Sequence, residues 1–545
     1  MLPIRKPNTD HSLLGLLLVL WLFLLFNLGG WGVIETSEAR YAEISREMWL
    51  SGDWLHPRLL GIQHYHKPPV TYIVTAFGME LFGPNAFGAR FFLQLSLLLQ
   101  VWLVYLIGKA LFANPRQALL AAVLYFTIPA VLLSARNLTT DSFLTTFELA
   151  AILAWVRYRS RAEVGWLYFF YLLLALAFLT KGPVGLIFPV LVAIGLGGNY
   201  AALNKRHTSG WHHLPGLLLF LALGSSWYVY LMLHDPQFVD YFLFKHTVQR
   251  YANPETFGRS KPWWFYLVLA PALSLPWSAI LLVQFRRLRE MPRPLKRLFI
   301  LWIPVPLVFF SFSGSKLILY ILPIFAGQAL LTTWLLLHMP EKAVKKAMNY
   351  ALLYFSVLAV ALFVAPLLPV GVELPWRVLV FPVLILAALA ILWTGERLPQ
   401  QKLVYGALVF TALLLPYSAK LLAHNPQFTN GSRPIAEAIQ ARNLQQRPVL
   451  VYNKLLPSLA FELHRSIISL EDGSSKLERE TQFEQDEKWR EQLLQLHQPE
   501  DMQRLRQLLQ QDPVLVVKKN LPEERQWLLQ YFDEQQQVGE WTIYF

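Results

Sequence analysis

The sequence predicts an α-helical polytopic membrane protein that ends in a small soluble α/β domain. Its mean hydropathy is +0.38, and only 15% of its 545 residues are charged, whereas soluble domains carry about 25%. The charge is also uneven along the chain: residues 1–419 hold 33 Lys and Arg and 17 Asp and Glu, against 15 and 18 in residues 420–545. The boundary near Lys420 therefore separates a membrane body, 1–419, from a soluble domain, 420–545.

Thirteen apolar runs in the membrane body are long enough to cross a hydrocarbon core of about 30 Å as helices. They lie at about 12–30, 86–108, 117–135, 140–156, 165–180, 183–198, 214–233, 263–285, 298–312, 317–337, 349–368, 378–395 and 403–419. Two longer loops, 31–85 and 234–262, separate some of them. This pattern is typical of a multi-pass membrane protein with thirteen transmembrane helices.

Basic residues predict the orientation of these helices. With the N-terminus inside, every second short loop is rich in Lys and Arg, as cytoplasmic loops are. These loops contain Arg157, Arg159, Arg161, Lys205, Arg206, Arg286, Arg287, Arg289, Lys342, Lys345 and Lys346. An odd number of spans then places the C-terminal domain outside, which in a bacterium is the periplasmic side of the inner membrane. The net charge of +13 reflects this topology, so we expect no nucleic-acid partner.

The outer loops and outer helix ends hold a second group of basic residues, which the orientation rule does not explain. Snorkelling anchors and loop salt bridges are one interpretation. As a set, they also suit an anionic, phosphorylated ligand at the membrane surface. The candidates are Arg40, Lys67, Lys181, Arg250 and Lys316.

The first outer loop predicts two helices that lie on the membrane surface. Residues 38–50 form an amphipathic pattern, with Glu38 and Arg40 at its start. Pro68 and Pro69 stiffen the chain and favour a second helix over 70–82, so Lys67 is expected on a rigid arm. The same segments also suit a plain surface anchor with solvated charges.

Two acids lie in the span 140–156, one at its start and one further inside. Asp141 is placed at its outer start, where it suits either a helix cap or a catalytic carboxylate. Glu148 follows two turns along the same face, about 10 Å deeper. An ionisable group at that depth is usually functional or paired, but the sequence shows no partner for it.

Several residues are spaced to share one helix face. His246 and Arg250 are four apart, as are Lys316 and Tyr320. The first pair suits a phosphate clamp with or without a metal ligand. A divalent ion is permitted by the acids and histidines of the outer side, with His246 and His66 as candidate ligands, although no spacing requires one. The absence of cysteine excludes thiol nucleophiles, cysteine-bound zinc and disulfides.

Several motifs of the chain resemble those of the bacterial GT-C glycosyltransferases. The resemblance is greatest to the 4-amino-4-deoxy-L-arabinose lipid A transferases, within the group that also contains the protein O-mannosyltransferases. It covers about residues 12–330. The motifs are Arg40-Tyr41-Ala42-Glu43-Ile44-Ser45-Arg46-Glu47-Met48, Ser51-Gly52-Asp53-Trp54, Lys67-Pro68-Pro69, Thr180-Lys181-Gly182, His246-Thr247-Val248-Gln249-Arg250, Pro262-Trp263-Trp264-Phe265-Tyr266, Pro276-Trp277 and the run from Ser315-Lys316 to Pro323.

The resemblance implies a catalytic carboxylate in the first loop, where these enzymes have Asp-Glu. Ser37 stands in place of the family's Asp, and Glu38 matches its Glu. Glu38 is therefore the first candidate, followed by Glu35 and Asp141. His66 also departs from the family, which has Glu before Lys-Pro. Lys316 and Tyr320 match residues of the lipid-phosphate pocket, and Tyr65 is a candidate for stacking on the sugar.

By resemblance, the chain is expected to be an inverting glycosyltransferase that takes a sugar from polyprenyl (undecaprenyl) phosphate. An aminoarabinose-type transfer to lipid A at the periplasmic face is the leading expectation. A protein O-mannosyltransferase-like or other envelope-glycan transferase is the alternative within the enzymes. Outside that class, a lipid or sugar transporter or flippase remains, although the charges gather in outer loops rather than at mid-membrane.

The C-terminal domain alternates short strands and helices. Strands are predicted at 448–452, 466–470, 513–517 and 540–545, and helices at 433–443, 484–511 and 521–533. The domain contains no phosphate-binding loop, nucleotide fingerprint or catalytic triad in its sequence.

Overall fold

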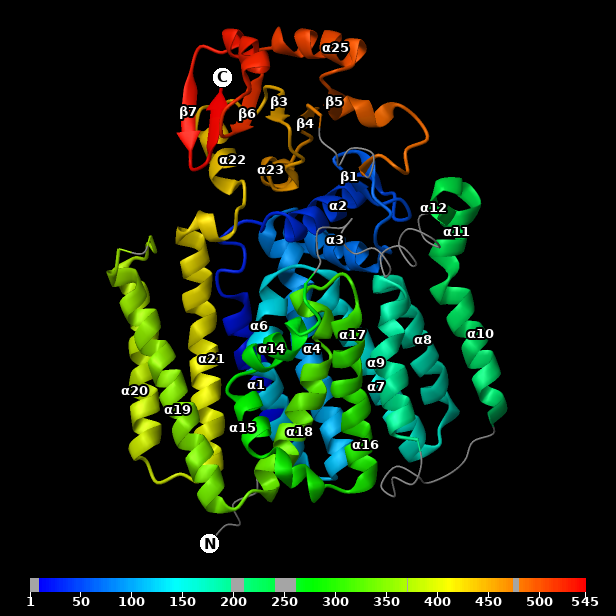
Figure 1. Ribbon diagram of the computed structural model, residues 1–545, viewed down its shortest axis with the longest axis vertical. Helices are drawn as coiled ribbons and strands as arrows, with labels where there is room; N and C mark the ends of the chain where they lie inside the picture. Colours follow the sequence, from blue (N-terminus) through cyan, green and yellow to red (C-terminus); the bar gives the residue numbers. More distant parts are fainter. Residues whose placement is uncertain (1–8, 198–209, 241–260, 370, 474–479) are drawn as a thin grey trace. The chain divides into compact units, whose positions relative to one another are not determined.

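The computed structural model describes residues 9–197, 210–240, 261–369, 371–473 and 480–545. It is mostly helical (Figure 1). The chain divides into two compact units. Unit 1 comprises Met1–Asn27, Leu93–Arg136 and Thr140–Lys420; unit 2 comprises Leu28–Phe92, Asn137–Thr139 and Leu421–Phe545. Unit 1 ends at Lys420, and residues 28–92, which the sequence places with the membrane body, group with the C-terminal segment.

Unit 1 is a bundle of helices, and each of the thirteen predicted apolar runs contains one or two of them. The helices are α1 (Thr9–Leu25), α4 (Ala86–Phe112, which begins in unit 2), α5 (Pro115–Phe126), α6 (Pro129–Arg136), α7 (Thr140–Arg161), α8 (Val164–Lys181), α9 (Ile187–Gly195), α10 (His213–Gly224), α11 (Ser226–His234), α12 (Pro236–Asp240), α14 (Phe265–Ala272), α15 (Trp277–Val283), α16 (Arg293–Trp302), α17 (Pro304–Phe312), α18 (Ile324–His338), α19 (Glu341–Val364), α20 (Val380–Thr394) and α21 (Pro399–His424, which ends in unit 2).

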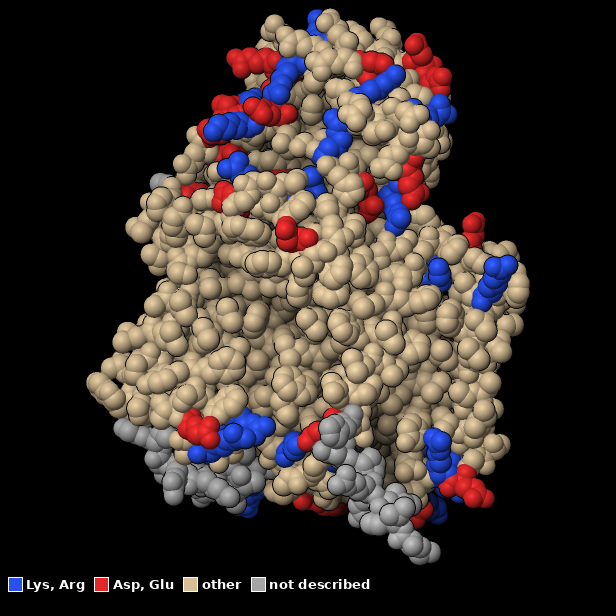
Figure 2. Space-filling view, turned by 180° about the vertical axis from the view of Figure 1, so that it is seen from behind, with Lys and Arg blue, Asp and Glu red and all other residues tan. Residues whose placement is uncertain are grey.

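Among the described residues, six helices are long and apolar enough to cross a membrane, and nine if three bent pairs each count as one span. A broad band over the helices of unit 1 carries almost no charged side chain on the face in Figure 2. Lipid tails offer no partner for charge, so such a band suits a bilayer. The chain is a multi-pass membrane protein.

Prolines break two of the predicted spans. The run 263–285, predicted as one straight helix, consists of α14 and α15 at an angle of 112°. Pro271 lies inside α14 and Pro276 precedes α15, and neither can donate a backbone hydrogen bond. The run 117–135 is likewise divided, with α5 and α6 at 60°. Asn114 begins α5 by accepting hydrogen bonds from the amides of Arg116 and Gln117, at 3.0 and 3.4 Å.

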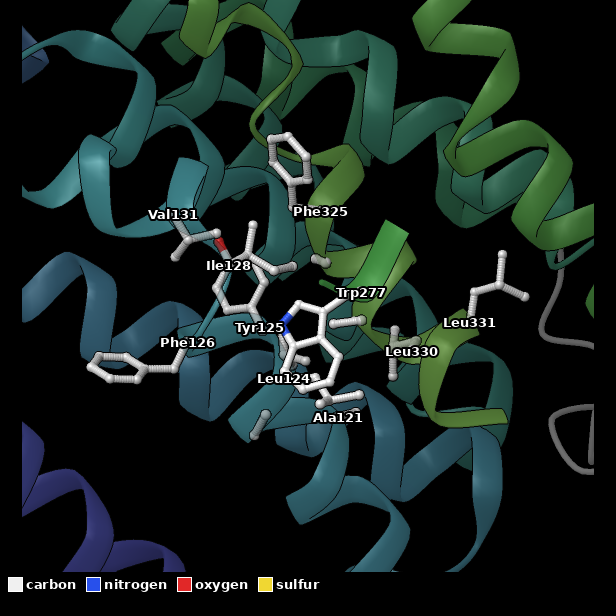
Figure 3. Packing of buried hydrophobic residues seen from close by; sticks show 14 of the residues in the cluster. Ala121, Leu124, Tyr125, Phe126, Ile128, Val131, Trp277, Phe325, Leu330 and Leu331 are labelled. Carbon is white, nitrogen blue, oxygen red and sulfur yellow. The ribbon is translucent and has the colours of Figure 1, made fainter. Parts of the chain in front are cut away.

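The core of unit 1 is apolar and closely packed. Figure 3 shows Trp277 of α15 among residues of α5 and α18, including Tyr125 and Leu330. The indole nitrogen of Trp277 donates to the hydroxyl of Thr127, at 3.1 Å, which satisfies its only polar atom. This cluster fixes the bent segment 265–283 against its neighbours.

Unit 2 contains a six-stranded mixed sheet in the order β5-β4-β3-β6-β8-β7. Strands β5, β4, β3 and β6 run parallel, and β8 pairs antiparallel with both β6 and β7. The strands and helices are β3 (Val449–Tyr452), β4 (Ile468–Glu471), β5 (Leu493–Gln495), β6 (Val514–Lys518), β7 (Gln535–Val538), β8 (Trp541–Tyr544), α22 (Arg433–Ala441), α23 (Pro457–Leu463), α25 (Pro499–Leu509) and the 3₁₀ helix η11 (Glu523–Tyr531).

One predicted helix of this region is wrong. The sequence predicts a helix over the run 484–511, but only α25 at its end is an α-helix. Strand β5 occupies its middle, where Leu493 and Leu494 are buried beside β4. Pro499 starts α25 and cannot continue a preceding helix. Tertiary burial therefore overrides the helical propensity of the surrounding glutamines.

Residues 28–92 of unit 2 form α2 (Ser37–Ser51), a hairpin of β1 (Arg58–Leu59) and β2 (Ile62–Gln63), and α3 (Val70–Phe82). The two helices predicted in the first loop are confirmed. Their apolar faces, however, share a core with the C-terminal segment: Ile44, Met48 and Tyr72 cluster with Ile435 and Leu459. This common core explains why the first loop belongs to unit 2.

Candidate functional site

In unit 1, a carboxylate and an amine meet where one helix begins and another ends. Asp141 lies in the first turn of α7 and Lys181 is the last residue of α8, and these helices pack together. The Lys181 ammonium donates to the Asp141 carboxylate, and both side chains are 9% exposed. An acid at a helix N-terminus and a base at a C-terminus are both favoured by the helix dipoles. The second carboxylate oxygen of Asp141 makes no hydrogen bond to the residues that the structure describes.

Tyr320 completes this cluster. Its ring centroid lies 4.1 Å from the Lys181 ammonium, which is a cation–π contact. Asp141, Lys181 and Tyr320 come from three distant parts of the sequence, and unit 1 brings all three together. We call them the Asp141 cluster.

Lys316 lies in the segment before the 3₁₀ helix η6 (Ile318–Ile321), so it does not share a helix face with Tyr320 as its spacing suggested. Its ammonium is buried and donates to the carbonyls of Lys261 and Ser313, at 2.8 and 2.6 Å. The backbone of the next residue, Leu317, bonds to the hydroxyl of Tyr266 in both directions, at 2.7 and 3.1 Å. Tyr266 therefore holds the Lys316 segment in place.

Glu148 lies deeper on α7 and is fully buried. Neither of its carboxylate oxygens has a hydrogen-bond partner among the described residues. A polar network lies along the same helix: Gln100 donates to the hydroxyls of Ser142 and Thr146 and accepts from Tyr125. Glu148 stays outside this network, so it has no hydrogen-bond partner in the part of the chain that the structure describes.

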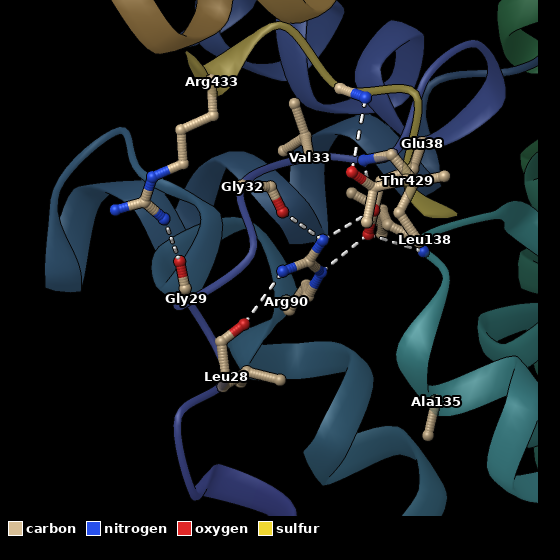
Figure 4. A network of polar contacts seen from close by, with 12 residues as sticks. Leu28, Gly29, Gly32, Val33, Glu38, Arg90, Ala135, Leu138, Thr429 and Arg433 are labelled. Atoms are coloured by element: carbon tan, nitrogen blue, oxygen red, sulfur yellow. Dashed lines mark hydrogen bonds and ion pairs between the residues drawn. The ribbon is translucent and has the colours of Figure 1, made fainter. Parts of the chain in front are cut away.

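In unit 2, Glu38 is buried in a saturated network (Figure 4). Its two oxygens accept two hydrogen bonds from the guanidinium of Arg90, each of 2.7 Å. The amides of Ile34 and Leu138 donate to the same carboxylate, at 2.8 and 3.0 Å. Four donors leave little capacity for a substrate, and this geometry is that of a structural ion pair.

Arg90 makes several further contacts. Besides Glu38, it donates to the carbonyls of Leu28 and Gly32, at 2.9 and 2.5 Å, and lies 4.3 Å from the ring of Trp31. The sequence did not indicate Arg90 as the partner of Glu38. Its only signal was its status as a charged residue near the start of an apolar run.

Glu35 also contacts the backbone of unit 2. One carboxylate oxygen accepts from the amide of Ser458, at 3.1 Å, near the start of α23. The other is buried and has no hydrogen-bond partner among the described residues. Burial raises the pKa of Glu35, an effect that the Ser458 hydrogen bond and the charge of Arg40 partly offset. The Nε atom of Arg40 is likewise buried without a hydrogen-bond partner in the part of the chain described.

The segment after the β1–β2 hairpin holds three further candidates. Tyr65 is buried, and its ring centroid lies 5.1 Å from that of Phe483, so its face is already packed. His66 lies beside His64, with ring centroids 4.3 Å apart. Lys67 is half-buried and precedes the two prolines before α3. The other two candidates, His246 and Arg250, lie outside the described residues.

A cavity of about 450 Å³ is also present in unit 2, beside the end of α2. Its lining includes Arg46, Glu47, Arg58, His464 and Arg465. None of the predicted site residues lines it.

Comparison with known proteins gives the fold of this arrangement. ArnT from Cupriavidus metallidurans, in a crystal structure bound to undecaprenyl phosphate, superposes with a TM-score of 0.75 over 98% of this chain and 97% of that one, at 22% identity. The chain has the fold of ArnT. The same protein in the apo state gives a TM-score of 0.74.

Proteins with similar sequences were found as well. An undecaprenyl phosphate-alpha-4-amino-4-deoxy-L-arabinose arabinosyl transferase from Pseudomonas fluorescens is 32% identical over 58% of this chain and 56% of its own length. One from Pseudomonas aeruginosa is 33% identical over 58% of each. The chain thus matches less than two thirds of the length of these relatives. Residues 66–230 match the dolichyl-phosphate-mannose-protein mannosyltransferase family model. The resemblance found in the motifs is confirmed.

Proposed function

We propose that the chain is an inverting glycosyltransferase of the bacterial inner membrane that uses a polyprenyl-phosphate sugar, with undecaprenyl phosphate as the lipid carrier. The Asp141 cluster carries the proposal: a lysine and an acid are held at helix ends by a fold shared with an undecaprenyl phosphate-bound protein. Aminoarabinose transfer to lipid A is the proposed reaction because the relatives named for that sugar match over 58% of the chain. The proposed orientation puts the site and the C-terminal segment in the periplasm.

The donor carries its own leaving group, so the enzyme must bind a phosphate and stabilise charge as the C1–O bond breaks. Lys181 is the proposed phosphate ligand in unit 1, and Lys67, Arg40, Arg250 and Lys316 are the further candidates. Ammonium and guanidinium groups suit a phosphate dianion, and their effect is greatest where water is scarce. Attack by the acceptor on the face opposite the leaving phosphate inverts the configuration at C1.

Asp141 is the proposed catalytic carboxylate, ahead of Glu38 and Glu35. Its free oxygen can orient or deprotonate an acceptor hydroxyl, which is the usual task of such a group. Both oxygens of Glu38 are engaged by Arg90 and by backbone amides. Glu35 keeps one oxygen without a hydrogen bond among the described residues, but its other oxygen accepts from the Ser458 amide and it pairs with no lysine there, so it ranks behind Asp141. A phosphate acceptor has a second pKa of about 6 and needs little base, so we expect Asp141 mainly to orient it.

The match to the mannosyltransferase model supports a second acceptor, the hydroxyl of a protein Ser or Thr. One experiment distinguishes the two. Purified protein in detergent is given undecaprenyl-phosphate aminoarabinose with either lipid A or an unfolded Ser/Thr-rich peptide, and products are read by mass spectrometry. Pentosamine-modified lipid A supports the proposal, a glycopeptide supports the alternative acceptor, and an unchanged donor with both acceptors contradicts glycosyl transfer from this donor. Glu437→Gln, a surface change in unit 2, serves as the control variant.

A further inference from the structure

The cavity beside the end of α2 is rich in basic side chains. Its volume is about 450 Å³, within the range of small-ligand sites. Among the described residues, its lining includes three arginines and two histidines, which come from α2, from the segment around the β1–β2 hairpin and from the segment after α23: Arg46, His56, Arg58, His464 and Arg465. Glu47 is the one acid among the described lining residues. The cavity therefore favours an anion.

Two of these arginines have no acidic partner. Neither Arg58 nor Arg465 forms an ion pair in the part of the chain that the structure describes. Arg58 is exposed, whereas Arg465 is half-buried and donates to the carbonyl of Gln445. A guanidinium has five N–H donors, so this one bond leaves Arg465 with donors for a ligand. Both arginines can therefore bind an anion without giving up an existing ion pair.

The other charges at the cavity already have partners. Arg46 is buried and donates to both carboxylate oxygens of Glu43, at 2.7 and 2.6 Å. The Glu47 carboxylate accepts hydrogen bonds from the amides of Leu60 and Gly61, at 2.6 and 3.1 Å. These backbone donors offset part of its negative charge, so the two arginines without an acidic partner dominate the potential in the cavity.

Local contacts fix the walls of the cavity. The hairpin turn has positive φ angles at Leu60 and Gly61, of 53° and 74°. A Cβ atom at Gly61 would lie 2.8 Å from the side chain of Gln492, which also lines the cavity, so the hairpin packs closely against the segment before β5. The Nδ1 atom of His56 lies 2.9 Å from a carboxylate oxygen of Asp53. A site with walls fixed in this way loses little conformational entropy when a ligand binds.

We propose that this cavity binds a phosphate group, with Arg58 and Arg465 as its main ligands. A phosphate reaches such a cavity either in a phospholipid headgroup or as a soluble ion, and the group recognised is the same. Leu50 favours the lipid, because this cavity residue is 61% exposed and offers an apolar edge to acyl chains. The site goes beyond the proposed glycosyl transfer, since none of its residues belongs to the Asp141 cluster.

The test measures both ligands on the full-length protein in detergent, after phospholipid and phosphate have been removed. Native mass spectrometry measures the adduct with phosphatidylglycerol, and the thermal midpoint measures stabilisation by inorganic phosphate against chloride at the same ionic strength. We expect the double variant Arg58→Gln with Arg465→Gln to bind phosphatidylglycerol about 10-fold more weakly than the wild type, because it loses charged hydrogen bonds to the phosphate. Arg58 is exposed, so Arg58→Gln alone should fold and should already weaken the adduct.

Arg506→Gln is the matched control. Arg506 is an exposed arginine of α25 that does not line the cavity, and it too forms no ion pair with a described residue. The control should bind like the wild type, and the midpoint without ligand shows whether each variant folds. Loss of the lipid adduct in the cavity variants supports a headgroup site, and loss of phosphate stabilisation alone supports a site for soluble phosphate. The proposal is wrong if folded cavity variants match the wild type in both measurements, or if Arg506→Gln changes them equally.

Discussion

Two buried ion pairs, one in each unit, have similar chemistry but different surroundings. In unit 2, Glu38 and Arg90 are both fully buried, and every charged atom of the carboxylate is bound by the guanidinium or by a backbone amide. In unit 1, Asp141 binds Lys181 through one oxygen, and the lysine also lies over Tyr320. A saturated pair stabilises a fold, whereas a pair with spare capacity can exchange its partner for a substrate. Only the pair of Asp141 and Lys181 is therefore suited to catalysis.

The largest expected effect is on folding, from Arg90→Ala. Removing the guanidinium leaves the Glu38 carboxylate buried and unpaired, a change that costs about 3–5 kcal/mol. We expect little folded protein, measured as monodisperse yield in detergent and as the thermal midpoint. The double variant Arg90→Met with Glu38→Leu should recover much of the loss, since it removes both charges. A folded, active Arg90→Ala protein would contradict the structural role of the pair.

Asp141→Asn should reverse this pattern, with a large effect on activity and a small one on folding. The amide keeps the shape of the side chain but loses the charge that pairs with Lys181 and that we expect to orient the acceptor. We expect kcat/KM for donor consumption to fall by about 100-fold or more, with a thermal midpoint close to the wild type. Glu38→Gln is the paired measurement: if it lowers activity as much as Asp141→Asn without destabilising the protein, the assignment of Asp141 as the catalytic carboxylate is wrong.

Sequence patterns predicted local structure in both units but not which segments share a core. The helix expected at 38–50 is α2, and the one at 70–82 is α3, because each has its own amphipathic pattern and boundary residues. Their grouping with the C-terminal segment depends on one apolar cluster that contains both Ile44 and Ile435, and no local pattern encodes this cluster. For the same reason the helix expected at 484–511 is wrong, since strand β5 is stabilised by its neighbour β4.

The candidate site shows the same limit. Lys181 and Asp141 were each identified from their positions at helix ends, and the structure joins them. The role of Glu38 was not predictable, because its partner Arg90 is 52 residues away and the family motif drew attention to the acid alone. Residue type and spacing indicated which groups carry charge, but only the fold determines which of those charges are already neutralised.

A pH series tests a further group of acids in unit 2. Burial and the neighbouring Glu43 carboxylate raise the pKa of Glu47 well above its ordinary value of 4.5. An acid with a raised pKa in the folded state stabilises the fold when protonated, and that contribution is lost as pH rises above the unfolded value. The thermal midpoint should therefore fall as pH rises above the ordinary value of 4.5, and Glu47→Gln should reduce this fall. Glu437→Gln, an exposed control, should leave the slope unchanged; an unchanged slope in Glu47→Gln would refute the assignment.

The smallest expected effect concerns Glu148 of unit 1. Among the described residues, this acid has neither an ion-pair partner nor a hydrogen-bond donor. Both carboxylate oxygens are buried without hydrogen bonds among the described residues, so the polar group carries a desolvation cost that no hydrogen bond from those residues offsets. Glu148→Met keeps a similar volume and removes that cost, and we expect a gain of about 1 kcal/mol in stability with activity retained. The thermal midpoint and donor consumption measure both. If activity falls while stability rises, Glu148 belongs with Asp141 among the functional acids, and its lack of a partner is a cost kept for the reaction rather than a feature of the fold.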